Sequence, residues 1–191
     1  MERGVVSESG VAGSPSQGSE RRATAPRAKV VRALYTPEQR LRRDATRWTL
    51  VQGILAPIQF LVFMVSAVLV VRSLVTGQGE FAAHMSIIAK TILLYTIMVT
   101  GAIWEKVVFG QYLFAEAFFW EDAVSFVVIA LHTIYLGGLL TDRLSTNTLF
   151  LVALAAYSVY VVNAVQFILK LRAARLQEAE EVRLRAAGTL A

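Results

Sequence analysis

The sequence has no cysteine, and this absence removes several chemistries at once. Disulfide bonds, thiolate metal sites and cysteine nucleophiles are all excluded. The signatures GxGxxG, GxxxxGK[ST], HExxH and GxSxG are absent as well. Two histidines, His84 and His132, are too few and too far apart in depth for a di-iron centre or a histidine-bridged haem pair. Carboxylates, lysines, tyrosines and one deep histidine remain, and these suit proton transfer.

Charged residues are scarce over four long apolar stretches, and 55% of the chain is hydrophobic. Each stretch is long enough to cross about 30 Å of hydrocarbon as a helix. The predicted spans are about 49–71, 85–104, 121–140 and 148–169. The net charge of +5 comes mostly from two terminal segments beside apolar helices. The positive-inside rule accounts for that pattern, so we expect a lipid bilayer as partner and no nucleic acid.

The remaining segments complete the predicted domain organisation. Residues 1–33 are expected to be a disordered N-terminal tail without a signal-peptide core. Residues 34–48 predict a basic amphipathic interfacial helix that ends at Trp48, with Thr36 as N-cap and Gln39 completing a capping box. Residues 49–170 form the four-helix membrane domain, and 171–191 a charged helical tail. The predicted fold is an all-α integral membrane protein, an up-down bundle of four transmembrane helices with both termini cytoplasmic.

The stretch 101–122 concentrates acidic residues between Trp104 and Trp120, at the predicted mouth of two spans. Acidic side chains in this position are costly unless they are used or satisfied. We therefore interpret the stretch as a working edge. The alternative is a solvated loop with interfacial aromatic anchors, although its aromatic residues are also suited to a slot for a flat ligand.

Polar residues recur at helical spacing on the spans and are expected to turn inward, away from lipid. They outline a polar pocket at the cytoplasmic side with His132 as its floor: Gln52, Gln59, Glu105, Glu121, Ser125, Asn163, Gln166 and Lys170. For Gln52, Ser66 and Asn163, interhelical hydrogen bonding is the preferred interpretation. For Glu121 with His132, function is preferred. Lys90 lies within the second span, and snorkelling outward is the simple alternative for it.

Several stretches resemble one family along about residues 34–176. LYTPEQRLRRDATRWTLVQGILAPIQFLVF, YTIMVTGAIWEKVVFGQYLFAEAFFWEDAVSF, LHTIYL and NAVQFILKLRAARL look like the bacterial 3-vinyl (bacterio)chlorophyllide hydratases. WEKVVFG and FFWED are the most distinctive parts. The resemblance implies an enzyme of bacteriochlorophyll biosynthesis, a lyase that hydrates the C3 vinyl group of chlorophyllide a to a 1-hydroxyethyl group. It implies no cofactor, because the magnesium belongs to the substrate.

Hydration in this sense needs an acid, a held water and exclusion of bulk solvent. Desolvation at the hydrocarbon edge favours a protonated carboxyl group. The catalytic candidates are Glu121 as first choice for the acid, Glu105 as second, Asp122 or Glu105 to orient water, and His132 as base or axial ligand to the substrate magnesium. The substrate-binding candidates are Lys106 and Lys170 for a propionate, with Trp104, Trp120, Gln59, Gln166 and Asn163 around the ring.

Two competing functions stay open. One is a non-enzymatic tetrapyrrole-binding or pigment-assembly protein, which needs the aromatic slot and His132 but not the carboxyl cluster. The other is a small transporter or channel subunit, which the absence of an internal repeat argues against. The expected location is a bacterial inner membrane, cytoplasmic or intracytoplasmic, with chlorophyllide a as ligand and other enzymes of the same biosynthesis as candidate partners.

Overall fold

The computed structural model describes residues 34–188, which form helices and connecting turns without a strand in that range. The helices are α1 (Pro37–Ala45), α2 (Arg47–Thr76), α3 (Glu80–Phe109), α4 (Phe119–Thr141) and α5 (Thr146–Ala186). The predicted disordered tail, residues 1–33, lies outside the described residues. Each predicted span lies inside one of the four long helices, and the charged tail from residue 171 continues α5 without a break to Ala186.

The start of α1 follows from its local sequence. The Thr36 hydroxyl accepts from the Gln39 amide at 3.2 Å, and the Gln39 side chain accepts from the Thr36 amide at 2.9 Å. This reciprocal pair confirms the predicted capping box. The helix ends at Ala45 and not at Trp48, because Thr46 takes extended backbone and its hydroxyl accepts from the Trp48 amide to cap α2.

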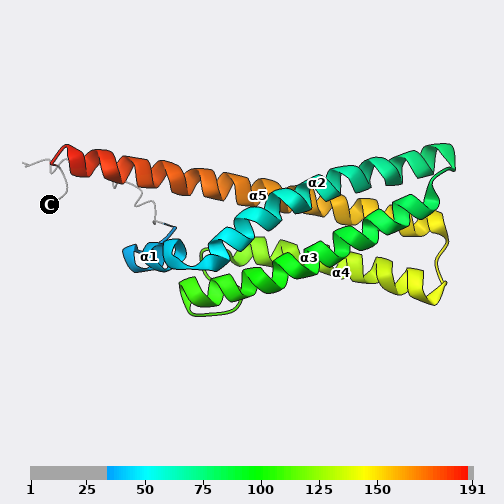
Figure 1. Ribbon diagram of the computed structural model, residues 1–191, viewed down its shortest axis with the longest axis horizontal. Coiled ribbons are helices and arrows are strands. Elements are labelled where there is room, and N and C mark those ends of the chain that lie inside the picture. The colour runs from blue at the N-terminus through cyan, green and yellow to red at the C-terminus, as the bar shows by residue number, and fades with distance from the viewer. Residues whose placement is uncertain (1–33, 189–191) are drawn as a thin grey trace, which may run out of the picture. The chain divides into compact units, whose positions relative to one another are not determined.

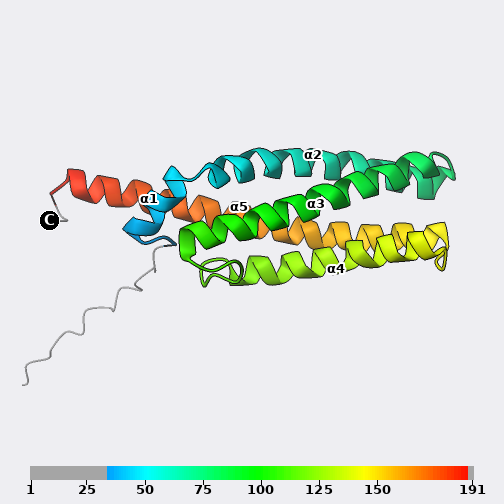
Figure 2. The same ribbon diagram turned by 60° about the horizontal axis from the view of Figure 1, so that its bottom comes forward.

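Two antiparallel helix pairs make the bundle, as Figures 1 and 2 show. Helices α2 and α3 form one hairpin and α4 and α5 the other, and close backbone contacts concentrate within these pairs. Gly77 ends α2 with a φ of 66°, a conformation that favours glycine. We call the end with the turns 77–79 and 142–145 the turn end, and the opposite end, with α1 and residues 110–118, the loop end.

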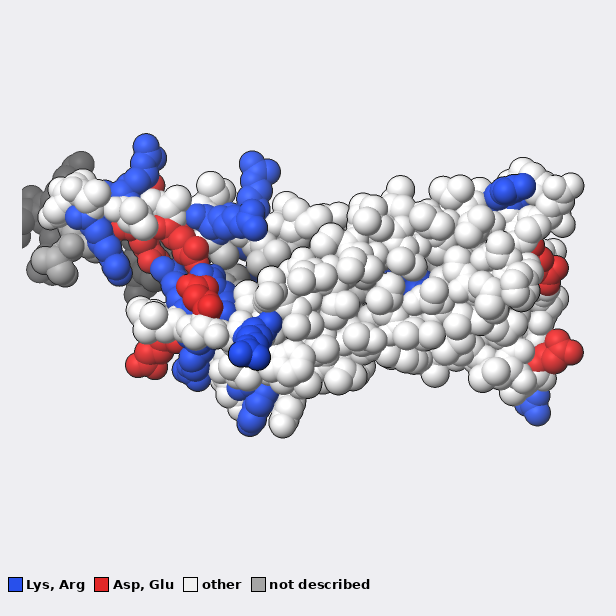
Figure 3. All heavy atoms as spheres, viewed as in Figure 1, with Lys and Arg blue, Asp and Glu red and all other residues white. Residues whose placement is uncertain are grey.

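The outer surface of the bundle is apolar over most of its length. All four long helices are long and apolar enough to cross a membrane, which confirms the predicted four-span helical fold. Figure 3 shows charged side chains gathered mainly at the end with α1 and the last turns of α5, and a few at the other end. The broad band between them is white except for a small blue patch. Which end faces the cytoplasm stays a prediction from the charge asymmetry.

Side chains from both hairpins meet in what we call the inter-hairpin seam, defined by Ser66, Lys90, His132, Tyr157 and Tyr160. The Ser66 hydroxyl from α2 lies 2.5 Å from the Tyr157 hydroxyl of α5. Phe63 from α2 packs on Tyr160 with ring centroids 4.9 Å apart. The hydrophobic core of the bundle therefore carries polar groups in the layer that joins its two halves.

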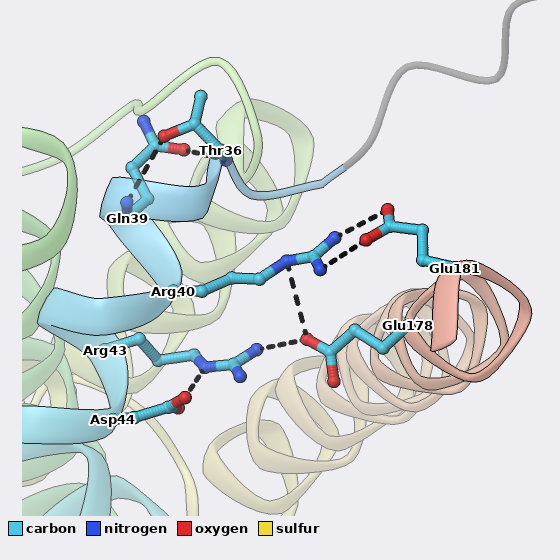
Figure 4. A network of polar contacts seen from close by, with 7 residues as sticks. All are labelled: Thr36, Gln39, Arg40, Arg43, Asp44, Glu178 and Glu181. Atoms are coloured by element: carbon cyan, nitrogen blue, oxygen red, sulfur yellow. Dashed lines mark hydrogen bonds and ion pairs between the residues drawn. The ribbon is translucent and has the colours of Figure 1, made fainter. Parts of the chain in front are cut away.

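Helix α1 is tied to the far part of α5 by ion pairs (Figure 4). The Arg40 guanidinium donates to both carboxylate oxygens of Glu181, at 2.6 and 2.9 Å, and Arg43 donates to Glu178 at 2.8 Å. A bidentate guanidinium–carboxylate pair fixes orientation as well as distance. The hydrogen bonds to Glu181 raise the pKa of Arg40 above its ordinary value. The Arg40 guanidinium therefore stays charged at any physiological pH.

Candidate active site

Residues 110–118 close the loop end between α3 and α4. Gly110 ends α3 with a φ of 88°, where a side chain would be strained. Phe114 adopts a φ of 57°, which is uncommon for a residue other than glycine and marks a backbone held by its surroundings. The Lys106 ammonium donates to the Gly110 carbonyl at 2.7 Å and so stabilises the start of this loop. The Lys106 side chain remains exposed at the surface.

Two carboxyl groups hold the loop from inside. The Phe114 amide donates to Asp122 Oδ2 at 2.7 Å, and the Ala115 amide donates to Glu105 Oε2 at 3.2 Å. Glu105 and Asp122 are also hydrogen-bonded to each other through their side chains. A hydrogen bond between two carboxyl groups requires a proton on one of them. Both residues are buried, at 5% exposure, so this shared proton is shielded from bulk water.

Glu121 precedes Asp122 in the chain but has a different partner. Its Oε2 lies 2.5 Å from the Lys170 ammonium, which also donates to the Ala117 carbonyl. Glu121 is buried at 4% exposure, so the pair replaces water around both charges. The structure thus brings together Glu105, Glu121, Asp122 and Lys170 at the loop end, and we call these four residues the carboxyl cluster. The cluster contains a carboxyl–carboxyl pair and an ion pair.

An aromatic cluster from separate segments covers these polar groups. Tyr35 stacks on Phe109 with centroids 5.8 Å apart and planes 17° from parallel, and Phe118 stacks on Phe167 at 5.9 Å. Trp104 packs edge-on against Phe118. Burial raises the pKa of the Tyr35 phenol to about 12, so it packs as a neutral ring. Sequence reasoning missed Tyr35, Phe118 and Phe167, although the density of aromatic residues in the loop was a visible signal.

The two tryptophans of the predicted slot are not brought together. Trp104 is partly buried and its indole N–H donates to the Thr49 hydroxyl at 2.9 Å. Trp120 is 69% exposed and packs edge-on against Phe119. Gln52 donates to Thr100 at 2.7 Å on the α2–α3 side, which is the interhelical bonding predicted for it. Of the two, only Trp104 packs into the aromatic cluster with Phe109 and Phe118.

The deeper predicted residues lie along the seam. His132 is buried at 1% exposure, as predicted for the inward stripe of α4, and Gln59 at 3%. Asn163 donates to the Ser125 hydroxyl at 2.7 Å, again the interhelical bond expected of it. Its carbonyl oxygen and that of Gln166 are buried without a hydrogen-bond partner. Polar atoms with open bonding capacity thus continue from the carboxyl cluster toward His132.

Lys90 overturns the snorkelling alternative. Its side chain is 0% exposed, and the ammonium lies 3.7 Å from the centre of the Tyr160 ring. The cation–π contact compensates only part of the lost hydration. His84, for which no role was expected, lies at the turn end, where its Nδ1 is 2.5 Å from the Tyr135 hydroxyl and its Nε2 is 3.6 Å from Glu80.

Two hollows in the surface of the described residues lie away from the carboxyl cluster. One, of about 240 Å³, lies between α1 and α5 and is lined largely by the ion-pairing residues of Figure 4. Another, of about 310 Å³, is an open apolar groove on the outer face of α2, lined by Met64, Val65, Val68 and Leu69. In this conformation the carboxyl cluster itself is packed shut by the loop and the aromatic rings.

Four membrane-spanning helices with a shielded carboxyl pair at one end define a multi-pass membrane protein equipped for proton transfer. The family model described as 2-vinyl bacteriochlorophyllide hydratase matches residues 35–173, and the chain belongs to this family. This confirms the resemblance drawn from the sequence; the descriptions differ only in how the ring position of the vinyl group is numbered.

Two relatives carry the same description. A 2-vinyl bacteriochlorophyllide hydratase of Rhodobacter capsulatus is 67% identical over 159 residues, which cover 83% of this chain and 90% of the relative. That of Cereibacter sphaeroides is 68% identical over 145 residues, covering 76% of this chain and 90% of the relative. No solved structure matches the chain. The matched region includes the whole carboxyl cluster and the seam.

Proposed function

We propose that this protein adds water across the vinyl group of chlorophyllide a, giving a 1-hydroxyethyl group, as a hydro-lyase of bacteriochlorophyll biosynthesis. Membership of the hydratase family supports the reaction class. The hydrogen-bonded Glu105–Asp122 pair is the observation that carries the mechanism. The reaction needs one proton donor and one water, and it needs no redox group, so we propose that the enzyme uses no cofactor of its own.

Glu105 is the proposed acid. Asp122 accepts the Phe114 amide at 2.7 Å, a shorter hydrogen bond than the 3.2 Å one from the Ala115 amide to Glu105, and the stronger hydrogen bond favours the charged form of its acceptor. The shared proton therefore belongs to Glu105, poised for donation. Glu121, the first choice from the sequence, instead forms an ion pair with Lys170. We assign Glu121 the role of holding Lys170 and the loop in place.

The proposed steps return the pair to its starting state. Glu105 transfers its proton to the terminal vinyl carbon, and a new C–H bond forms. The positive charge that develops on the carbon next to the ring is delocalised into the macrocycle and stabilised by the two carboxylates. Water forms the C–O bond at that carbon, and its surplus proton passes to Asp122 or Glu105. The pair again holds one proton.

The surroundings support this chemistry. Loop 110–118 and the aromatic cluster exclude bulk solvent, which strengthens electrostatic interactions inside the site. Lys106 lies at the surface of the loop end, and its hydrogen bond to the Gly110 carbonyl leaves two N–H donors for the propionate of a bound pigment, while Lys170 already has two acceptors. Four apolar helices support a place in a bacterial inner membrane, beside enzymes that supply the vinyl pigment and take up the hydroxyethyl product.

Conversion by the purified protein tests the proposal. The protein in detergent or nanodiscs is incubated with vinyl pigment in ¹⁸O-labelled water, without added metal, reductant or other protein. The expected product gains the mass of one labelled water. Tight pigment binding without conversion would instead support the pigment-assembly alternative, and a strain lacking the protein would then not accumulate vinyl pigment.

A further inference from the structure

Two buried groups in the seam are not used by the proton transfer just described. His132 comes from α4 and Lys90 from α3, so each hairpin contributes one. Their side-chain exposures are 1% and 0%. Neither His132 Nε2 nor the Lys90 ammonium has a hydrogen-bond partner among the described residues. A buried polar atom without a partner is destabilising, so an interaction that helps only to hold the bundle together does not account for the pair.

The hydrogen bond of the other ring nitrogen fixes the state of His132. Nδ1 lies 2.8 Å from the Val128 carbonyl oxygen. A carbonyl can only accept, so Nδ1 carries the hydrogen, and Nε2 of the neutral ring is a bare lone pair. A histidine whose remote N–H is anchored on a backbone carbonyl is the usual arrangement of a metal ligand. The bond to a residue one turn earlier also tilts the ring toward the loop end.

The surroundings exclude a conventional protein metal site. No group of three or more potential metal-ligating residues exists in the described part of the chain. One histidine can nevertheless hold a metal whose other positions are filled by the ligand that carries it, as in a metallated tetrapyrrole. The rings near His132 suit a flat aromatic guest: Tyr157 lies 5.9 Å from the histidine ring, and Phe63 packs against both Tyr157 and Tyr160.

The depth of His132 also suits the proposed reaction. It lies ten residues from Asp122 on α4, or about 15 Å at 1.5 Å per residue. The His132 ring is tilted along α4 toward the carboxyl cluster, because its Nδ1 bonds to the Val128 carbonyl one turn nearer the loop end. A planar macrocycle that stands in the seam with its metal at His132 extends along that interval, and one of its edges points toward the loop end, where Glu105 lies. Because contacts within each hairpin are much denser than those between hairpins, the seam is the surface along which the bundle can separate.

We propose that the seam between the two hairpins is the pigment-binding site, in which His132 Nε2 ligates the central magnesium of the substrate and its vinyl edge faces Glu105. This inference rests on the proposed function, because it names the place and orientation of that substrate. The magnesium arrives and leaves with the pigment and is not a resident cofactor.

Pigment binding with and without the magnesium tests the site. Binding of the hydroxyethyl pigment and of its magnesium-free form is measured by fluorescence quenching, so that hydration of a vinyl group does not intervene. The wild-type protein is expected to bind the magnesium form about tenfold more tightly or better. His132→Leu should abolish this preference and leave binding of the magnesium-free form within about twofold. The matched control His84→Leu, at the turn end, should keep the preference.

A second variant covers a failure of His132→Leu to fold. His132→Gly leaves space for free imidazole, which should restore the preference for the magnesium form. A preference that persists in His132→Leu or His132→Gly without imidazole, or that is missing from the wild type, would overturn the site. If the wild-type protein hydrates the vinyl pigment but does not prefer the magnesium form, the proposed function stands and the proposed site is refuted. If it prefers the magnesium form but does not hydrate the vinyl pigment, the site stands and the proposed function is refuted.

Discussion

Adjacent residues in this chain acquire opposite chemical properties from their partners. Glu121 and Asp122 are neighbours at the start of α4, and both are buried. Glu121 meets the Lys170 ammonium, while Asp122 meets a backbone amide and the carboxyl group of Glu105. Glu121 is therefore one half of an ion pair, while Asp122 belongs to a carboxyl pair that shares one proton. The contrast resembles other acid–base sites in which two carboxyl groups take different roles because their environments differ.

The first prediction concerns these carboxyl groups. Glu105→Gln keeps an oxygen to accept the Ala115 amide and an N–H to donate to Asp122, but it has no acidic proton. Its kcat for hydration should fall by roughly 10²–10⁴-fold. Glu121→Gln should lose less than about tenfold, because it alters an ion pair and no transferred proton. Turnover measured under saturating pigment checks both values. Equal losses would refute the separate roles of the two residues, and a larger loss in Glu121→Gln would make Glu121 the acid.

Single residues also show where sequence reasoning succeeds. The capping box depends only on Thr36 and Gln39, two residues three positions apart, so it could be predicted from local spacing. The carboxyl richness of 101–122 was equally visible. The pairing of Glu105 with Asp122, and of Glu121 with Lys170, was not, because it depends on how the loop folds back and on the register between α4 and α5.

At the scale of the element, helices α4 and α5 approach closely near the turn end. A Cβ built on Gly138 would lie 2.6 Å from Leu144 Cδ1 and 2.9 Å from Leu149 Cδ2. Small residues permit such close packing in membrane bundles. Gly137, one position earlier, faces open space within 4 Å of its own Cβ position. The two glycines therefore form a natural pair of test and control positions.

The second prediction uses this pair. Gly138→Val should lower the free energy of unfolding by about 1–3 kcal/mol, because the added atoms overpack the α4–α5 contact. Gly137→Val should change it far less, since its side chain extends into free space. Unfolding followed by circular dichroism in detergent measures both. Equal losses in the two variants would show that helix propensity, and not packing against Leu144 and Leu149, governs this position.

The elements themselves were largely predictable, because apolar length and charge placement dictate spans. The end of α1 was not, since Thr46 rather than an interfacial Trp48 sets the break. Lys90 could not be placed either: within a span, snorkelling and burial produce the same sequence pattern. The face of α5 that supplies Tyr160 decides between them, and that requires the relative rotation of two helices.

At the scale of the whole molecule, the charge distribution predicts the topology. Residues 110–118 and both chain ends are expected in the cytoplasm, and the turns 77–79 and 142–145 on the opposite side. The arginines and lysines gather mainly at the end that carries α1 and the loop, as Figure 3 shows. Helix lengths alone do not determine which end is inside, so this orientation needs an independent measurement.

The third prediction exploits the missing cysteines, because a single introduced thiol is the only one in the chain. Gln78→Cys in the α2–α3 turn and Gln111→Cys in the loop are both exposed positions. In intact cells, a membrane-impermeant maleimide should label Gln78→Cys and spare Gln111→Cys until the cells are lysed. The opposite labelling pattern would invert the topology and place the carboxyl cluster on the outer side.

Helix α5 is a continuous rod of 41 residues, about 60 Å long, while hydrocarbon needs only about half of that. A tilt of about 10° at the seam would swing its far end by about 5 Å over the projecting half. That end is held to α1 by the ion pairs of Arg40 with Glu181 and of Arg43 with Glu178. In the proposed binding site, the opening between the hairpins is therefore coupled to a helix end that projects beyond the hydrocarbon. A protein that bound the projecting end of α5 and held it still would slow the entry and release of pigment without contacting the pigment.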